Sequence, residues 1–319
     1  GALGAGAGGG AAAAMGWWSW VWGARAAGQP AAAAEPAYAA ADFTGAGQTI
    51  IVIDDGMSPF YDQSATVWSY DFSGANDADA SKTSLYSHGD WVAQSALDEA
   101  PDVDIIHLKV FPDGGGGASL GDIEEALQMS IALTGYFDIA AVNLSLGFGN
   151  TTTETLTPLS DEFAMLDALG VISVAAAGNS GTTYDDGVNV LAADPNVVAV
   201  SAVDSDGDLA SFSQRSDTLT DIAADGVNRT AETVWGGTVT VSGTSFAAPE
   251  VAGIAARLSE ASATLLGEDL TDEELIDILN KSGSAVQNAD APYAVADGDA
   301  AVAYFIDNLE YYDDGLMIA

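Results

Sequence analysis

The stretch IIVIDDGM, residues 50–57, places four branched aliphatic residues directly before two adjacent aspartates and a glycine. An unbroken aliphatic run of this kind is typical of a β-strand buried on both faces, as the strands of parallel sheets are. In open parallel sheets, ligands bind beyond the carboxyl ends of the strands. Asp54 and Asp55 are therefore candidates for a functional site, and the question is which of these two carboxylates acts there.

Further aliphatic runs follow and alternate with helix-like segments. The runs are DIIHLKVF (104–111), IAAVNLSL (139–146), VISVAAAGN (171–179) and NVVAVSAV (196–203). Strands that alternate with helices form parallel sheets with right-handed crossovers. The sequence therefore predicts an α/β fold, a doubly wound and mainly parallel sheet flanked by helices.

The pattern changes after residue 200. SAVDSDGDLASFS (201–213) predicts a hairpin, and FAAPEVAGIAARLSEA (246–261) predicts a long helix rich in small residues. Thr271 is followed three residues later by Glu274, a capping box that predicts the start of another helix.

The first 40 residues differ in composition from the rest. Residues 1–24 carry no charge, and a stretch rich in Ala and Pro follows them. We expect 1–40 to be a low-complexity leader or linker, 41–312 to be the folded domain and 313–319 to be a C-terminal tail. A signal or membrane remnant is the alternative for residues 1–24, but their many glycines make them only weakly apolar. No stable membrane insertion is expected.

The charge of the chain is strongly one-sided. Its 319 residues include 47 Asp and Glu but only 7 Lys and Arg, which gives a formal net charge of −40. This charge argues against nucleic acid or an anionic membrane surface as a partner. We interpret the excess acid as a solvated surface suited to high salt or to a calcium-rich medium. The absence of cysteine excludes disulfides, a thiol nucleophile and a Cys-ligated zinc site.

Several residues at predicted strand ends and helix starts can carry chemistry. Ser245, in SGTSFAAPEVAG, lies at a helix start, where it is either a cap or a nucleophile beside N–H groups that suit an oxyanion. His88 heads another helix and is a candidate base, which a carboxylate at the end of the IIVI strand would orient. The amide N–H of Asn179 could donate to a developing negative charge. His107 is flanked by aliphatic residues, and we expect it to be a core residue.

Five motifs together resemble the ordered signatures of the subtilisin-like serine proteases. They are VIDDG, SHG, LSLG, AAAGNSG and SGTSFAAPEVAG, over residues 40–285. The order Asp, His, Ser along the chain is that of subtilisin. Each motif alone is weak, but five that agree in order and spacing are highly specific. The resemblance implies a subtilisin-like peptidase domain and a serine endopeptidase activity.

The resemblance also implies a role for each matching residue. Ser245 would be the nucleophile, His88 the general base and acid, and Asp54 the carboxylate that orients His88. Asn179 would be an oxyanion donor beside the backbone N–H of Ser245. The edge that pairs with the substrate backbone and the wall of the pocket for the side chain before the scissile bond would be formed by Ser145, Leu146, Gly147, Ala177 and Gly178. The implied partners are polypeptide substrates, and we expect a secreted or cell-surface monomer.

Several positions depart from the usual pattern of the family, among them AADG at 223–226 in place of a usual APG. Asp90, Trp91 and Gln94 occupy the positions of a Thr, a His and a Gly after the catalytic histidine, and Glu250 replaces a His after the proline. We expect helix packing to differ around these residues, while the positions assigned to catalysis are retained.

Asp55 stands where the family usually has a small hydroxyl residue. Because successive side chains of an extended segment face opposite ways, we expect Asp55 to face outward, away from Asp54. Its charge is expected to raise the pKa of His88.

The predicted chemistry needs no cofactor. The resemblance implies structural calcium, but the sequence identifies no ligand. DSDGD (204–208) has the composition of a calcium loop, but the other ligands of such a loop do not follow, and we interpret it as a turn. The loop aspartates that could contribute are Asp71, Asp77, Asp79, Asp185 and Asp186.

Two functions of other classes compete with the protease. A catalytically inactive member of the fold, used for binding, would have no need to retain Asp54, His88, Asn179 and Ser245 together. A lipase or esterase would require a G-x-S-x-G elbow followed by Asp and His, whereas GTSFA lacks the second glycine and Ser245 comes last.

The substrate preference has two alternatives. Small residues at Ala177, Gly178 and Ala192 favour a large apolar side chain in the pocket. A DDG motif also occurs in the kexin and furin branch, which cuts after basic residues, and the negative charge would steer cationic substrates toward the protein.

The acidic composition predicts that stability depends on salt. Transfer from 1 M salt to 0.01 M salt with a chelator should lower the melting temperature, because the screening length grows from about 3 Å to about 30 Å. Thermal unfolding over a NaCl series, with and without calcium, measures the effect. A melting temperature indifferent to both salts would contradict the interpretation of the acidic surface.

Overall fold

The structure is a computed structural model, and it describes residues 38–74, 78–82 and 86–312. From Ala39 onward the described residues belong to one compact unit. Most of the expected leader and all of the expected tail lie outside the described residues, so the domain boundaries at residues 40 and 312 stay predictions. No described helix has both the length and the apolar composition needed to cross a membrane.

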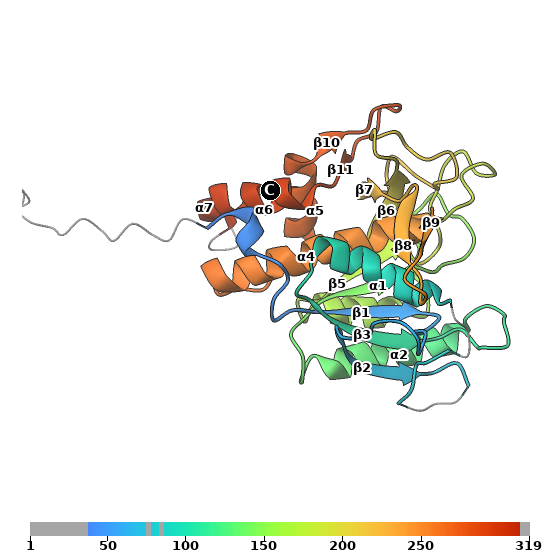
Figure 1. The fold of residues 1–319 in the computed structure, drawn as a ribbon. Coiled ribbons are helices and arrows are strands. Elements are labelled where there is room, and N and C mark those ends of the chain that lie inside the picture. The colour runs from blue at the N-terminus through green and yellow to red at the C-terminus, as the bar shows by residue number, and fades with distance from the viewer. Residues whose placement is uncertain (1–37, 75–77, 83–85, 313–319) are drawn as a thin grey trace, which may run out of the picture. The chain divides into compact units, whose positions relative to one another are not determined.

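A nine-stranded sheet forms the centre of the described unit, and it is parallel except at its β10–β11 edge (Figure 1). Its strand order is β10-β11-β7-β6-β5-β4-β1-β3-β2. The strands are β1 (Thr49–Asp54), β2 (Thr66–Asp71), β3 (Asp104–Lys109), β4 (Ile139–Leu144), β5 (Ile172–Ala176), β6 (Val198–Val203), β7 (Ile222–Asp225), β10 (Ser284–Ala285) and β11 (Ala294–Val295). The expected doubly wound, mainly parallel α/β sheet is confirmed.

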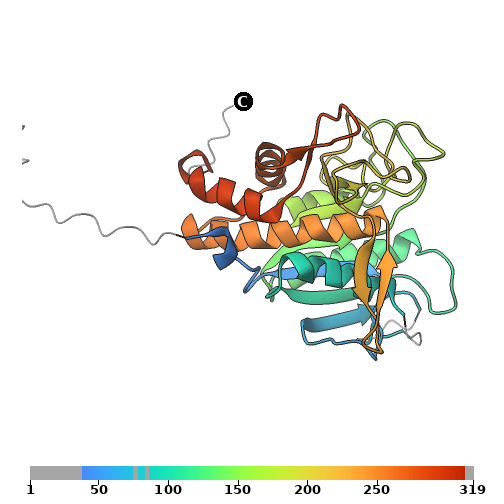
Figure 2. The same ribbon diagram turned by 45° about the horizontal axis from the view of Figure 1, so that its top comes forward.

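Helices cover both faces of this sheet (Figure 2). One face packs against α1 (His88–Glu99) and α4 (Thr244–Leu265), and the other packs against α2 (Leu120–Leu133) and α3 (Ser160–Asp167). The remaining helical segments are the short η1 (Ala40–Asp42), α5 (Asp272–Ser282), α6 (Gly298–Asp307) and α7 (Leu309–Tyr312). The capping box at the start of α5 is confirmed, because Glu274 N donates to Thr271 Oγ1 at 3.2 Å and Thr271 N donates to Glu274 Oε2 at 3.0 Å.

The alternation of β1 explains its unbroken aliphatic run. Ile50 and Val52 belong to the core cluster beneath α1 and α4, whereas Ile51 and Ile53 belong to the cluster beneath α2 and α3. Successive side chains of a strand point to opposite faces, so a strand between two cores must be apolar at every position.

Strand β1 lies at the point where the strand order reverses. It pairs in parallel with β3 on one side and with β4 on the other. Ligand sites of open α/β sheets form at such a reversal, beyond the carboxyl ends of the strands. Asp54, the last residue of β1, is therefore at the expected place for a functional group.

The acidic segment 204–208 forms a tight turn. Asp204 Oδ1 accepts hydrogen bonds from the backbone N–H groups of Asp206 and Asp208, both at 3.0 Å. Val203 and Leu209 face each other across the turn in an antiparallel bridge. These hydrogen bonds are those of a turn, which agrees with the interpretation of DSDGD as a turn.

A separate antiparallel hairpin, β8 (Arg229–Glu232) and β9 (Thr238–Val241), lies against α1 (Figure 2). Trp91 Nε1 donates to Glu232 O at 3.2 Å, and Glu232 N donates to Gln94 Oε1 at 2.8 Å. The unusual residues at 91 and 94 thus attach α1 to β8, so helix packing there is built around this hairpin.

The unusual residue Glu250 belongs to the same junction. Arg229 Nη1 lies 3.1 Å from Glu250 Oε2 on α4 and 3.2 Å from Asp225 Oδ2, and its Nη2 lies 3.5 Å from Asp98 Oδ2 on α1. Burial raises the pKa of Glu250 to about 8, although Arg229 opposes the rise. One arginine therefore joins β8 to both helices of this face.

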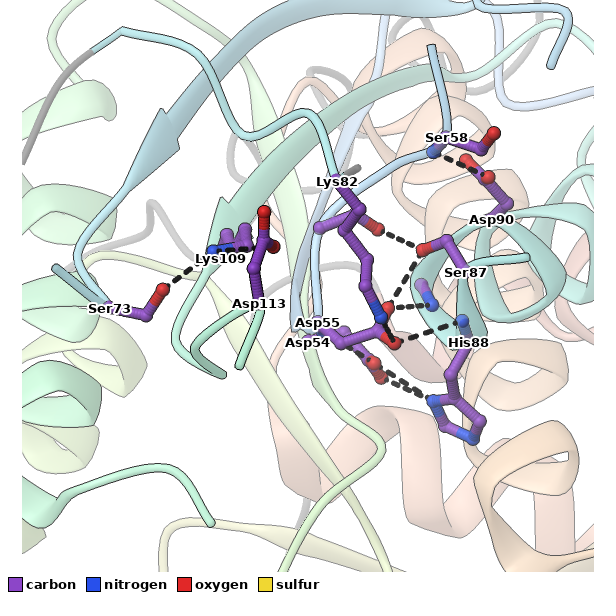
Figure 3. Close-up of polar contacts among 12 residues, drawn as sticks. Asp54, Asp55, Ser58, Ser73, Lys82, Ser87, His88, Asp90, Lys109 and Asp113 are labelled. Carbon is purple, nitrogen blue, oxygen red and sulfur yellow. Dashed lines mark hydrogen bonds and ion pairs between the residues drawn. The ribbon is translucent and has the colours of Figure 1, made fainter. Parts of the chain in front are cut away.

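Lys109, the last residue of β3, is buried in an ion-pair network, with only 2% of its side chain exposed (Figure 3). Its Nζ donates to Asp71 Oδ2 at 2.8 Å and to Ser73 Oγ at 2.6 Å, and it lies 3.4 Å from Asp113 Oδ1. Burial would raise the pKa of Asp71, but the hydrogen bonds from Lys109 and Ser73 outweigh it and lower the pKa. The network ties the ends of β2 and β3 to the following loop.

Lys109→Met should destabilise the protein by about 3–5 kcal/mol, because it leaves a buried carboxylate without its partner. Lys281→Met is the matched control, since Lys281 pairs with Asp277 at 2.8 Å but has 40% of its side chain exposed. Removing such a surface pair should cost less than about 1 kcal/mol. Urea unfolding of both variants measures the difference, and equal losses would contradict the role of the Lys109 network.

Candidate active site

The first two candidate groups meet where β1 ends and α1 begins (Figure 3). Asp54 is 2% exposed, and His88 Nδ1 lies 2.8 Å from its Oδ1 and 3.0 Å from its Oδ2. A carboxylate at this distance fixes the proton on Nδ1, which leaves Nε2 to act as an acceptor.

Two glycines allow this close approach of strand and helix. A Cβ at Gly89, the second residue of α1, would collide with the backbone oxygen of Gly56. Gly56 itself has a φ of 90°, a backbone conformation that residues with a Cβ strongly disfavour. The glycines that follow Asp55 and His88 therefore allow the end of β1 and the start of α1 to come into close contact.

The two histidines have opposite environments. Burial alone would lower the pKa of His88, but the carboxylates of Asp54 and then Asp55 outweigh it and raise the pKa. His107 is 1% exposed, and burial lowers its pKa to about 4. Its Nδ1 has no hydrogen-bond partner among the described residues, so His107 is a neutral core residue, as expected.

Ser245 is the second residue of α4, and it does not cap that helix. The cap position is Gly243, with no side-chain cap bond. Ser245 Oγ instead donates to Ser145 O at 3.3 Å, and Ser145 Oγ donates back to Ser245 O at 2.8 Å. Asn143 Nδ2 donates to Ser145 Oγ at 2.9 Å, so the end of β4 holds the serine in place.

The amide of Asn179 has a fixed orientation. Its Oδ1 accepts hydrogen bonds from Thr244 N at 2.9 Å and Thr244 Oγ1 at 3.1 Å. Because a backbone N–H can only donate, this contact turns the oxygen of the amide toward Thr244. The amide nitrogen of Asn179 therefore remains as a donor, and Asn179 lines a cavity that Ser245 also lines.

Two cavities meet at Ser245. The first has a volume of about 260 Å³ and is lined by Ser145, Leu146, Gly147, Gly178, Asn179 and Ser245 among others. The second, of about 370 Å³, is lined by Asp54, Asp55, Lys82, His88, Asp113 and again Ser145 to Gly147 and Ser245. The structure thus brings the three residues Asp54, His88 and Ser245 to one cavity.

Ala177 differs from the expectation. It is fully buried in the core cluster beneath α2 and α3, and Ala176 lines the first cavity in its place. Strand β5 ends at Ala176, so the neighbouring residue faces the opposite way. Ala192 is likewise buried and does not line this cavity.

The sequence did not reveal two amides in the first cavity. Asn189 is 3% exposed and donates its amide to Ala176 O, while Gln214 is 3% exposed and donates to Asn150 Oδ1 at 2.7 Å. Neither lies in one of the five motifs. Asn189 had a weak signal, as a polar residue within the apolar stretch VNVLAA (188–193), whereas Gln214, within the polar stretch SFSQRSD (211–217), had none.

No group of three or more His, Cys, Asp or Glu in the described parts of the chain is arranged to hold a metal ion. Of the aspartates expected as ligands, Asp71 forms an ion pair with Lys109, and Asp79 Oδ1 accepts a hydrogen bond from Ser81 N at 2.9 Å. Asp77 lies outside the described residues. The described residues therefore offer no cluster of three carboxylates for the expected structural calcium, which stays a prediction.

Comparison with known proteins establishes the class of protein that this fold and site define. The model of the subtilase family matches residues 45–295. The chain belongs to the subtilase family, and the resemblance read from the five motifs is confirmed.

Relatives of known name agree with this assignment. A cuticle-degrading serine protease of Arthrobotrys oligospora is 32% identical over 68% of this chain and 53% of its own length. A thermophilic serine proteinase of a Bacillus species is 35% identical over 67% of this chain and 52% of its own length. The chain therefore spans about half the length of these relatives.

Solved structures agree on the fold. A cold-adapted subtilisin-like serine proteinase superposes with a TM-score of 0.65 at 27% identity, over 80% of this chain and 89% of that one. A protease from Pseudoalteromonas arctica has a TM-score of 0.67 at 23% identity, over 83% of this chain and 92% of that one. The subtilisin-like form of the α/β fold is thus confirmed.

The site predicts distinct titrations for the two histidines. His88 should titrate above its ordinary pKa of 6.5, whereas His107 should titrate at about 4. Asp54→Asn should lower the pKa of His88, because it removes the nearest negative charge, and should leave His107 unchanged. NMR titration of labelled imidazoles measures both values, and a His88 pKa unaffected by Asp54→Asn would contradict the pairing.

Proposed function

We propose that this chain is an active serine endopeptidase that hydrolyses polypeptides through an acyl-enzyme formed on Ser245. The observation that carries the proposal is the contact of 2.8 Å between His88 Nδ1 and Asp54 Oδ1, in a cavity that Ser245 also lines. A binding module would not need a buried carboxylate that fixes the tautomer of a histidine beside a serine.

The proposed steps use residues of this chain alone. His88 Nε2 accepts the proton of Ser245 Oγ as the oxygen attacks the substrate carbonyl carbon. Asn179 Nδ2 and the backbone N–H of Ser245 stabilise the negative charge on the carbonyl oxygen. His88 then gives its proton to the leaving amine, and a water repeats the sequence to release the acid. Asp54 holds the ring in place throughout.

The two cavities suggest how a peptide is held. Residues Leu146 and Gly147 lie beyond the end of β4 and would pair with the substrate backbone as an added strand. Gly178 would then open the first cavity to the side chain before the scissile bond. No Asp or Glu is among the residues that line this cavity. A cationic side chain would find no counter-charge there, so this lining argues against the basic alternative.

The setting of the protein is part of the same proposal. Its relatives include the minor extracellular protease Epr of Bacillus subtilis, which favours a secreted or cell-surface location. We expect the enzyme to act as a monomer without a cofactor in its chemistry. Structural calcium remains an expectation, for which melting in chelator is the test.

Labelling with a fluorophosphonate probe tests the nucleophile. Folded wild type should be labelled and should cleave a mixed peptide library, whereas Ser245→Ala should do neither. Ser242→Ala is a matched control, because Ser242 lies in the short connection between β9 and α4 and is exposed. Absence of labelling in salt and calcium would refute the protease proposal in favour of an inactive binding module. The residues found before the cleaved bonds decide between apolar and basic preference.

Asn179→Ala should reduce kcat by roughly 100- to 1000-fold with little change in KM, the range found when one oxyanion donor is removed from subtilisin. The substitution also removes the acceptor of two hydrogen bonds from buried Thr244, so the melting temperature should fall, and the kinetics are measured well below the transition. Steady-state kinetics on one cleaved peptide measures the split. A change in KM alone would mean that Asn179 binds substrate without stabilising the transition state.

A further inference from the structure

The side chain of Asp55 is turned toward the start of α1 (Figure 3). Its Oδ1 accepts hydrogen bonds from Ser87 Oγ at 2.7 Å and Gly89 N at 2.9 Å, and its Oδ2 accepts from His88 N at 3.2 Å. Only 18% of the side chain is exposed. The expectation that Asp55 faces outward is therefore wrong, because β1 ends at Asp54 and strand alternation does not continue past it.

Asp55 supplies the cap that α1 otherwise lacks. The first N–H groups of a helix have no partner within the helix and attract negative charge. Ser87 occupies the cap position but makes no side-chain cap bond, since the single proton of its Oγ is directed to Asp55 Oδ1 at 2.7 Å and Gly56 O at 2.6 Å. The carboxylate of Asp55 thus satisfies two of these N–H groups, and one of them belongs to His88 itself.

Lys82 completes the arrangement. Its Nζ forms an ion pair with Asp55 Oδ2, and both side chains line the cavity that contains His88 and Ser245. Burial would raise the pKa of Asp55, but Lys82, Gly89 and Ser87 outweigh it and lower the pKa. Asp55 is therefore held as a carboxylate whose charge is balanced locally.

We propose that Asp55 and Lys82 are a positioning pair for His88. Asp54 fixes the ring of the histidine, and Asp55 fixes the backbone of the same residue. Lys82 offsets the second negative charge, so that two adjacent carboxylates do not keep His88 protonated. The proposal rests on the proposed function, in which neutral His88 is the general base.

The charges around His88 come from several elements. Asp54 ends β1 and Asp55 follows it, Lys82 precedes α1, and Asp113 follows β3 and lines the same cavity. From α4 the ring of Phe246 packs at 5.5 Å and carries no charge. Asp55 raises the pKa of His88 and Lys82 lowers it, so removing either one alone unbalances the pair.

A set of charge variants gives opposite predictions for the two partners. Asp55→Asn keeps an acceptor for the helix but loses the charge, so the acid limb of kcat/KM should move to lower pH. Lys82→Met leaves Asp55 unbalanced, so the acid limb should move to higher pH. The double variant should return close to the wild-type profile.

Asp55→Ala also removes the cap, and it should lower kcat by about 10- to 100-fold with little change in KM, since small misplacements of a catalytic group cost that much.

The measurements are pH profiles on one cleaved peptide, NMR titration of His88, and melting temperatures. Lys281→Met and Asp277→Asn break an ion pair on α5 and serve as controls, which should leave kcat and the acid limb unchanged. The proposal is overturned if both single variants move the limb in the same direction, or if neither moves it. A loss of melting temperature without a change in kcat or limb would assign the pair a structural role only.

The outcome can be separated from that of the proposed function. The titration of His88 is read without substrate, so the charge balance is tested even if the wild type is not labelled by the fluorophosphonate. If the titration shifts as expected while labelling fails, the positioning of His88 holds and the protease proposal falls.

Discussion

The burial of β1 on both faces is the constraint on which the rest of the structure depends. Ile50 and Val52 pack under one pair of helices, and Ile51 and Ile53 pack under the other. A slip of one residue in register would move every side chain of β1 into the opposite core, where its shape does not match the packing, and would shift Asp54 away from the carboxyl edge of the sheet. The carboxyl end of β1 is therefore rigidly positioned, and so are Asp54 and the His88 ring that contacts it.

From this fixed point the sequence could predict a large part of the site. Asp54, His88, Asn179 and Ser245 each lie at a strand end or helix start that the aliphatic pattern and the glycines reveal. Such residues are predictable because local chain geometry and a short motif specify them together. The same reasoning predicted that His107, in the middle of a buried strand, is a core residue.

Prediction failed where a periodic rule was extended past the end of an element. Asp55 follows the last residue of β1, and the chain has already turned there. The position of Ala177 was taken from the resemblance, and Ala177 is buried in the core instead of lining the first cavity. Prediction also failed for Lys82 and Gln214, whose contacts join residues far apart in the sequence. The position of such a side chain depends on the packing of the whole fold, so no local pattern carries it.

The chain has only seven Lys and Arg residues, and most of those that the structure describes form ion pairs within the protein. Lys82, Lys109, Arg229 and Arg257 each pair with carboxylates from other elements and are at most 19% exposed. Among the described residues, few positive groups are left on the surface to meet the carboxylates of another molecule. Two copies therefore approach each other as like-charged particles, and under the proposed protease function this repulsion would slow the attack of one molecule on another. In concentrated salt the repulsion is screened, so the acidity that keeps copies apart in dilute buffer would give little protection from self-digestion in brine.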